Sequence, residues 1–225
     1  MNSLTPVRPR LVIGNRNYSS WSLRPWLLLR QCGVVFDTEL IPLDTADFES
    51  TVARVSPSRR VPVLVDADVT VWDSLAIGLY AAERWPQVRL WPQAPTARAQ
   101  AMAVTAEMHS GFAALRGSCP MNIRRRLTDF DLPEAAAADA RRIQQIWREA
   151  RERFGADGEF LFGEFGLADA FFAPVATRFQ SYGLRLDPLC QRYVDALMAL
   201  PAMVEWCAAA AAEPWTIAAT EAVGG

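Results

Sequence analysis

Three serines within four positions are the residues of this sequence best placed to do chemistry. Ser19, Ser20 and Ser22 lie between an apolar segment, residues 11–13, and an apolar helical run that starts at Trp26. Ser22 can cap that helix, because its hydroxyl oxygen can accept a hydrogen bond from an orphan backbone N–H. The positive end of the helix dipole then lies behind the serines, so the loop could stabilise an anion. The alternative is that the serines only turn the chain and cap the helix.

Two further segments could bind a small anionic ligand. Asp73-Ser74 precedes an apolar helical run, and the free N–H groups of that helix could hold a carboxylate together with the Ser74 hydroxyl. Val61-Pro62 enters a strand from a loop, and a bend there would expose the backbone of Val61 to an extended ligand. Arg60 could reach a second carboxylate. These segments predict a short, peptide-like ligand with a carboxylate at each end; the alternatives are a helix cap, a strand proline and a surface arginine.

The chain around these residues predicts a small mixed domain. Segments rich in β-branched and aromatic residues are expected to form strands, at residues 11–13, 34–41, 61–65 and 69–72. One helix is expected to end at Gly33, which favours a left-handed cap, and another runs from Leu75 to about Arg84. The order is βαβ, a connecting segment at 44–55 and then ββα. This order matches a thioredoxin-like α/β fold with a parallel first pair and an antiparallel hairpin.

The second half of the chain predicts an all-α domain over residues 96–225. Apolar residues recur at helical spacing, first at Ala101, Val104, Met108, Phe112 and Leu115, and then at Ile143, Ile146, Trp147, Ala150 and Phe154. The proline-rich stretch 85–95 is expected to link this domain to residues 10–84, and residues 1–9 to form a loose arm. Asp169 can accept a hydrogen bond from the backbone of Gly166 and so start a helix over 167–182.

Composition excludes several other classes of protein. The chain of 225 residues has a net charge of −2, and three arginines at 124–126 are too few to indicate nucleic-acid binding. A single histidine, His109, excludes multi-histidine metal sites, and the four cysteines are dispersed. The alanine-rich stretch 208–212 is too short to span a bilayer. We expect a cytoplasmic protein with reduced cysteines, no metal, and no nucleic-acid or membrane partner.

These segments together resemble the cytosolic glutathione S-transferases of the serine type. The resemblance is carried by residues 19–24 (Ser-Ser-Trp-Ser-Leu-Arg), 60–64 (Arg-Val-Pro-Val-Leu) and 73–77 (Asp-Ser-Leu-Ala-Ile), and it covers nearly the whole chain. It is nearest to zeta-like bacterial members, whose motif is Ser-Ser-Cys-Ser. Trp21 stands at the cysteine position of that motif, which argues against a maleylacetoacetate isomerase.

The resemblance implies a role for each candidate residue. Ser19 would donate a hydrogen bond to the glutathione sulfur and favour its nucleophilic thiolate, with Ser20 and Ser22 as alternatives. The other contacts would run along the tripeptide: Arg60 at the glycyl carboxylate, the backbone of Val61 before a cis Pro62 at the cysteinyl part, and Asp73 with Ser74 at the γ-glutamyl end. As a further hypothesis, an acceptor-substrate pocket would be lined by Met108, Phe112, Met121 and Arg124. His109 is either a packed or surface residue, or a neighbour of that pocket.

The function implied by the resemblance is that of a glutathione transferase. Glutathione would be the co-substrate, its thiolate would attack a small electrophile in a detoxification reaction, and the protein would be a homodimer. One alternative is a zeta-like glutathione-dependent isomerase. Another is a non-catalytic interaction module with the same fold, against which the three serines argue. A serine hydrolase is disfavoured, because the sequence has no Gly-x-Ser-x-Gly motif.

Overall fold

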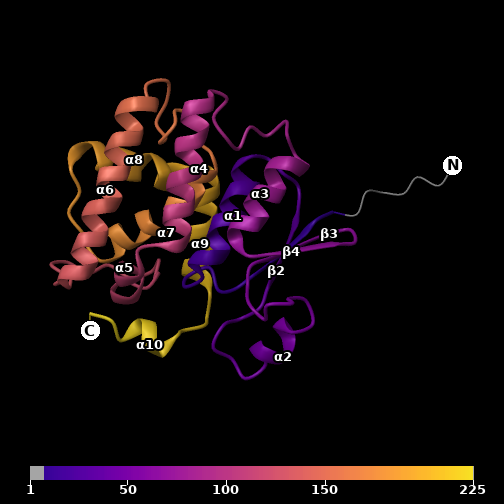
Figure 1. The fold of residues 1–225 in the computed structure, drawn as a ribbon. Helices are drawn as coiled ribbons and strands as arrows, with labels where there is room; N and C mark the ends of the chain where they lie inside the picture. Colours follow the sequence, from indigo (N-terminus) through magenta and orange to yellow (C-terminus); the bar gives the residue numbers. More distant parts are fainter. Residues whose placement is uncertain (1–7, 225) are drawn as a thin grey trace.

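The first half of the chain forms a four-stranded mixed sheet, as predicted. The computed structural model describes residues 8–224. The strand order is β2-β1-β3-β4 (Figure 1), where β1 is Arg10–Ile13, β2 Asp37–Leu40, β3 Val63–Asp66 and β4 Val69–Trp72. β1 pairs in parallel with β2 and antiparallel with β3, and β3 pairs antiparallel with β4 through a turn at Ala67. This is the thioredoxin-like order of βαβ followed by ββα.

Alternation along the central strands separates two hydrophobic clusters on the two faces of the sheet. Leu11 and Ile13 belong to the main core with α1 (Ser20–Gln31) and α3 (Ser74–Arg84), whereas Val12 belongs to a smaller cluster under α2 (Phe48–Val52). This alternation is the period of two that places successive side chains on opposite faces. α1 and α3 pack against each other, and Gly33, with φ of +73°, ends the first of them as predicted.

The start of α1 differs from the prediction that Ser22 is its cap. The helix begins one turn earlier, at Ser20, and Ser19 is the N-cap, because its side chain accepts a hydrogen bond from the Ser22 N–H. Ser22 instead turns its hydroxyl back toward the end of β1, where its Oγ accepts a hydrogen bond from the Gly14 N–H at 3.0 Å. Pro25 consequently lies inside the helix and not in its first turn.

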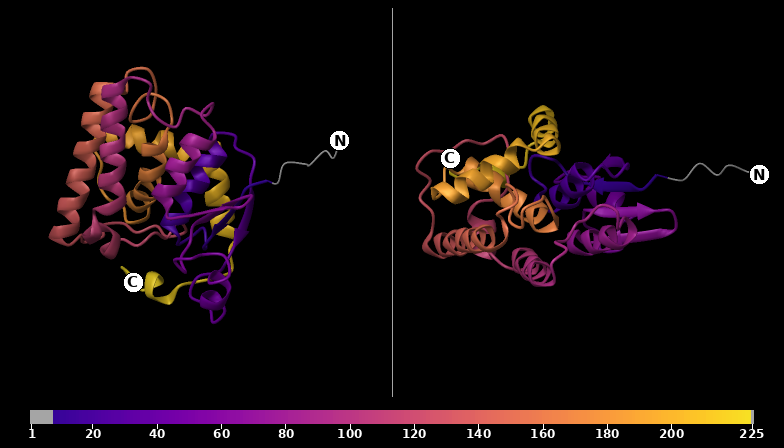
Figure 2. Two further views of the ribbon diagram at one scale, coloured as in Figure 1. Left: turned by 45° about the vertical axis from the view of Figure 1, so that its right-hand side comes forward. Right: turned by 90° about the horizontal axis from the view of Figure 1, so that it is seen from above.

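The second half is helical, as predicted, apart from two isolated β-bridges, Phe160–Gly163 and Phe162–Glu164. Its helices are α4 (Pro95–Ser110), α5 (Ala113–Ser118), α6 (Glu134–Phe154), α7 (Leu167–Ser181), α8 (Pro188–Ala199), α9 (Pro201–Ala212) and α10 (Ala218–Glu221). Figures 1 and 2 show these helices gathered beside the sheet. α7 is buried almost along its whole length and packs against α1, so one continuous core joins the two halves.

The apolar faces predicted for the long helices are buried, with one boundary difference. On α6, Trp147 is fully buried among aromatic rings of α7 and α8. On α4 the helix stops at Ser110, so Phe112 and Leu115 are buried beyond its end. Phe112 adopts a left-handed conformation, with φ of +61°, immediately before α5.

Segments without a helix or strand lie between the two halves and after α9, at residues 85–94 and 213–217. Residues 85–94 connect α3 to α4 without a helix or strand, and the arm expected at 1–9 lies almost entirely outside the described residues. After α9 the chain runs through residues 213–217 to α10, the last described helix (Figure 1). No single described helix is long and apolar enough to cross a membrane; α8 and α9 reach that length only as a pair, bent by 73°.

Candidate functional site

The serine loop is tied together by short hydrogen bonds. The Ser19 hydroxyl donates to the Ser22 Oγ at 2.7 Å, and the fully buried Ser22 is in turn fixed by the Gly14 N–H. Ser19 and Ser20 keep small exposed fractions, 6% and 9%. The hydrogen bonds of Ser22 therefore hold the loop in shape, and Ser19 and Ser20 are its slightly exposed neighbours.

All five residues expected to bind glutathione lie around one cavity. This cavity has a volume of about 360 Å³ and is lined by Arg60, Val61, Pro62, Asp73 and Ser74, together with Trp21, Ser58 and Trp72. The peptide bond between Val61 and Pro62 is cis. The structure thus brings together segments more than ten residues apart in sequence, but the serines of the loop are not among the lining residues. Trp21, in the first turn of α1, forms the wall on their side.

The N-terminus of α3 forms one end of this cavity. Asp73 caps the helix in a left-handed conformation, with φ of +74°, and its Oδ1 accepts hydrogen bonds from Leu75 N at 2.7 Å and Ala76 N at 3.4 Å. Ser74 is the first helical residue and its side chain is fully buried against the rest of the protein. The positive end of a helix dipole and a hydroxyl therefore converge where an anion would sit.

Positive charge gathers behind Trp21. The guanidinium of Arg24 lies over the indole ring at 4.2 Å from its centroid, and that of Arg116 at 4.7 Å. The His109 ring meets the same indole edge-on, with 5.3 Å between the ring centroids. Burial lowers the pKa of His109, Arg24 and Arg116 lower it further, and Asp73, whose Oδ2 is 3.6 Å from Nε2, opposes them. These surroundings consequently favour the neutral imidazole.

The residues hypothesised to line an acceptor pocket do not meet at this cavity. Met108, Phe112 and Met121 are buried in the hydrophobic core. Arg124 is engaged elsewhere, because its guanidinium donates to the Tyr18 hydroxyl and to the backbone oxygens of Glu213 and Trp215. Met108 and Phe112 stand at helical spacing, which fits a buried core as well as a pocket wall, so the spacing could not separate these two roles.

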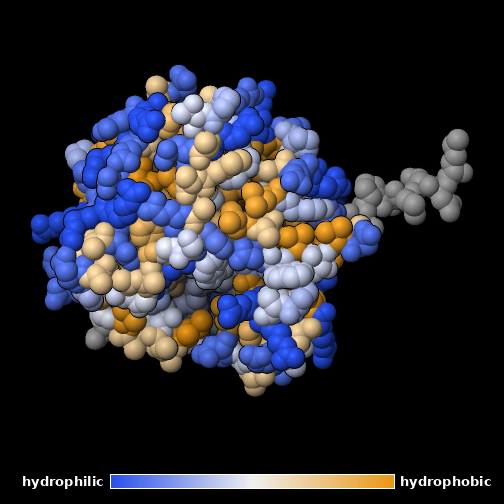
Figure 3. Space-filling model, viewed as in Figure 1, coloured by the Kyte–Doolittle hydropathy of each residue, from blue (hydrophilic) through white to orange (hydrophobic). Residues whose placement is uncertain are grey.

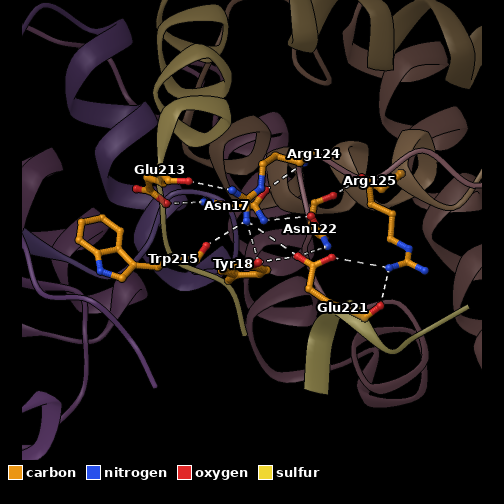
Figure 4. A network of polar contacts seen from close by, with 9 residues as sticks. Asn17, Tyr18, Asn122, Arg124, Arg125, Glu213, Trp215 and Glu221 are labelled. Carbon is orange, nitrogen blue, oxygen red and sulfur yellow. Dashed lines mark hydrogen bonds and ion pairs between the residues drawn. The ribbon is translucent and has the colours of Figure 1, made fainter. Parts of the chain in front are cut away.

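Arg124 belongs to a polar network that joins three distant segments (Figure 4). Asn17 and Tyr18 of the serine loop, Asn122 to Arg125, and the C-terminal residues Glu213 to Glu221 meet there. Glu213 accepts hydrogen bonds from the backbone N–H groups of Arg16 and Asn17 at 2.8 and 3.2 Å. The C-terminal segment therefore fixes the loop that carries the serines through these hydrogen bonds.

The chain's own thiols are poor candidates for a nucleophile. All four cysteines are free, and burial raises the pKa of Cys32 to about 11 and those of Cys119 and Cys190 to about 12. Burial also raises the pKa of Cys207. Because the thiolate is the nucleophilic form, a reacting sulfur would have to come from a ligand. Within residues 8–224, no three histidine, cysteine, aspartate or glutamate side chains are grouped so that they could hold a metal ion.

Sequence reasoning missed Trp21, Arg24 and Trp72 as parts of the site. Trp21 and Arg24 stand inside the serine motif, and their proximity to the hydroxyls was the available signal. Trp72 precedes Asp73 and is 45% exposed at the end of β4. A large exposed aromatic side chain beside a cavity is a common feature of a binding surface.

A thioredoxin-like domain with a cis-proline bend, joined to a helical domain, defines the class of protein. The family description "Glutathione S-transferase, N-terminal domain" matches residues 18–84, and "Glutathione S-transferase, C-terminal domain" matches residues 133–209. The chain belongs to the glutathione S-transferase family, as the resemblance of its motifs indicated.

Relatives and solved structures agree with this assignment. The chain is 28% identical over 191 residues to a glutathione S-transferase of Triticum aestivum, covering 82% of this chain and 86% of the relative. It is 25% identical to a stringent starvation protein A homologue of Pasteurella multocida, covering 77% of this chain and 76% of that one. A crystal structure of a glutathione transferase homologue from Burkholderia, with bound glutathione, has the same fold. Its TM-score is 0.69 at 24% identity, covering 91% of this chain and 99% of that one.

Proposed function

We propose that this protein is a glutathione transferase that conjugates the glutathione thiolate to small electrophiles. The observation that carries the proposal is the convergence of Arg60, Val61, Pro62, Asp73 and Ser74 on one cavity of about 360 Å³. A positively charged side chain lies at one part of this cavity and a helix N-terminus at another. A tripeptide with a carboxylate at each end could place one carboxylate at the side chain and the other at the helix N-terminus. The Burkholderia homologue of the same fold was solved with glutathione bound, which supports this choice of ligand.

The thiol would be activated by a hydroxyl and not by a general base. A free thiol has a pKa of about 8.5, so it is mostly protonated at neutral pH. A donor hydrogen bond and the N-terminal end of α1 both favour the thiolate. Ser22 and Ser19 are 2.7 Å apart, so reversing the direction of their hydrogen bond would let Ser22 donate to Ser19 and release the Ser19 proton for the sulfur. Ser20 is the alternative donor.

Calorimetric titration of glutathione into the protein tests the proposal. Ser74→Ala should weaken binding about tenfold or more, because a hydrogen bond to a charged carboxylate is lost. Ser19→Ala should bind glutathione within about threefold of the parent while raising the pKa of the bound thiol by about one unit, measured by thiolate absorbance. Ser110→Ala is the matched control, since that exposed hydroxyl bonds only within its own helix. A parent protein that does not bind glutathione at millimolar concentration would remove the transferase assignment and favour the interaction module.

We also propose that the protein forms a homodimer through β4 and α3. Three large apolar side chains are exposed there, Val69, Trp72 and Leu79, at 39%, 45% and 44%. Hydrophobic side chains gather over α3 and the β3–β4 hairpin in Figure 3. A shallow hollow of about 530 Å³ lies along the same face. An apolar patch of this kind on a folded surface is typical of a protein–protein contact.

The reaction is proposed to take place in the cytoplasm. The four free cysteines lie far apart and none is paired, which suits a reducing compartment. Conjugation of electrophiles there would serve detoxification.

A further inference from the structure

Arg24 is a buried cation without a carboxylate partner among the described residues. Its side chain is enclosed between Trp21 and Phe171, with Cζ at 4.2 and 4.9 Å from the two ring centroids, and only 1% of the residue is exposed. Its Nε is buried and has no hydrogen-bond partner. Burial of a guanidinium in this way is costly unless another charge compensates it.

This guanidinium lies within hydrogen-bond distance of Ser74 and His109. Arg24 Nη1 donates to Ser74 Oγ at 3.4 Å and lies 3.5 Å from His109 Nδ1. A guanidinium can only donate, so Nδ1 must accept and the imidazole proton lies on Nε2, on the side of Asp73. α1, the start of α3 and the end of α4 therefore meet around one charged group.

Neighbouring charges add to the positive field instead of cancelling it. Burial, followed by the charges of Arg116 and Arg178, lowers the pKa of Arg24 well below its usual value. The buried Arg178 donates to the backbone oxygens of Cys119 and Pro174 and has no carboxylate partner among the described residues. Asp73 is the one carboxylate that opposes this shift, and its side chain is 45% exposed. The region behind Ser74 thus carries excess positive charge in a place from which water is excluded.

The direction of the hydrogen bond at Ser74 determines what this hydroxyl can recognise. Because Ser74 Oγ accepts from Arg24, its own proton is free to be donated into the cavity that Ser74 lines. A hydroxyl polarised by a cation in a low-dielectric setting donates most strongly to a negatively charged acceptor. The N-terminus of α3 favours the same charge.

We propose that Arg24 is a positioning residue that, through Ser74, makes this end of the cavity selective for a carboxylate. On the proposed function, that group is the α-carboxylate of the γ-glutamyl residue of glutathione. His109 holds the guanidinium against Ser74 from α4, so the helical domain contributes to ligand selectivity without touching the ligand.

The test compares two ligands that differ only in this carboxylate. Glutathione and γ-aminobutyryl-cysteinyl-glycine, which lacks the α-carboxylate, are titrated into the parent protein and into Arg24→Met and Arg24→Lys. We expect Arg24→Met to weaken glutathione about tenfold, as for one lost charge-assisted hydrogen bond, and to leave the analogue within about twofold. Arg24→Lys should restore part of the lost affinity, because the charge remains.

Two further variants separate a ligand-directed role from a structural one. Arg60→Gln, at another part of the cavity, should weaken both ligands by the same factor. His109→Gln should weaken glutathione alone, by about threefold, and its partly exposed side chain makes it a safe substitute if the Arg24 variants do not fold.

Three outcomes would overturn the proposed role of Arg24. If the Arg24 and His109 variants weaken both ligands equally, or neither, the selectivity does not depend on Arg24 and the inference is wrong. If the parent binds glutathione and the analogue equally, no carboxylate is recognised at Ser74, although the transferase assignment survives. If the parent binds neither ligand, the proposed function fails and the inference fails with it.

Discussion

The Tyr18 hydroxyl donates a hydrogen bond to the carboxylate of Glu221, 203 residues further along the chain. The same Glu221 oxygen accepts from Asn122 Nδ2, and Arg124 donates to the Tyr18 oxygen. One residue before Ser19, the chain is therefore anchored to the C-terminal segment. The geometry of the serine loop depends on residues that no local pattern connects to it.

Loss of the Glu213 carboxylate should destabilise the fold through this anchor. Glu213 is 8% exposed and satisfies the N–H groups of Arg16 and Asn17, so Glu213→Ala leaves two donors without a partner. We expect the free energy of unfolding to fall by about 2–3 kcal/mol, measured by urea denaturation. Glu205→Ala is the control, because its ion pair with Arg30 is about half exposed and should contribute less than about 1 kcal/mol. Equal effects of the two variants would contradict this account.

Ser22 should contribute more to the stability of the fold than Ser20. Ser22→Ala removes the acceptor of the buried Gly14 N–H and the partner of Ser19, so we expect a loss of about 1–2 kcal/mol in the free energy of unfolding. Ser20→Ala removes no hydrogen bond found within residues 8–224 and should change stability by less than about 0.5 kcal/mol. Thermal or urea unfolding of both variants checks this. A Ser20 variant that is less stable than the Ser22 variant would contradict the conclusion that Ser22 holds the loop in shape.

Asp169 should give stability a distinctive pH dependence. Burial raises its pKa from 3.8 to about 6, although Leu161 N, Gly166 N and the Tyr193 hydroxyl donate to the carboxylate. Between these two pKa values the folded state binds more protons than the unfolded state. The contribution of Asp169 to stability is therefore largest below pH 4 and is lost as pH rises through about 6, by about 3 kcal/mol in all.

Asp169→Asn isolates this dependence from that of other groups. The asparagine amide has one accepting oxygen, so its NH2 group would face the N–H of either Gly166 or Leu161. We expect the free energy of unfolding to fall by about 1–3 kcal/mol at pH 7. The difference between parent and variant should grow as pH falls from about 6 to 4. It is measured by urea unfolding across that range, and a difference that stays constant would mean that the folded-state pKa is not raised.

The proposed dimer predicts an assembly that a single charge disrupts. Leu79→Glu places a carboxylate in the apolar patch on α3, where it would be desolvated without a partner. We expect the sedimentation coefficient to change from that of a dimer to that of a monomer, with the circular dichroism spectrum retained. Val204→Glu, at an exposed apolar position on α9 outside this patch, is the control and should leave the assembly intact. A parent protein that sediments as a monomer would end this proposal.

Local patterns were sufficient for most of the sheet domain. The left-handed cap at Gly33, the hairpin turn at Ala67 and the Asp73 cap each depend on residues within four positions of one another. The apolar run Leu11-Val12-Ile13 likewise indicated a strand, and the structure then placed its side chains in clusters on both faces of the sheet. Such short-range preferences are encoded wherever a residue type fits one backbone conformation better than others.

Three hydroxyls in four positions could not be told apart by pattern, because each is a good helix cap. Ser19 is the N-cap of α1, whereas the Ser22 hydroxyl accepts a hydrogen bond from the Gly14 N–H just after β1. The roles of Met108 and Phe112 were undecided for a related reason, since hydrophobic spacing reports a buried face and not what covers it.

The sequence alone determined the two-domain fold, the family resemblance and the segments that form the cavity, because these depend on periodicity and on motifs whose residues are close together. Only the tertiary structure decided which charges meet. Arg24 reaches Ser74 and His109 across 50 and 85 residues, and the C-terminal segment reaches the serine loop across about 200. Such contacts follow from how helices pack, and packing is set by the whole core and not by any one segment.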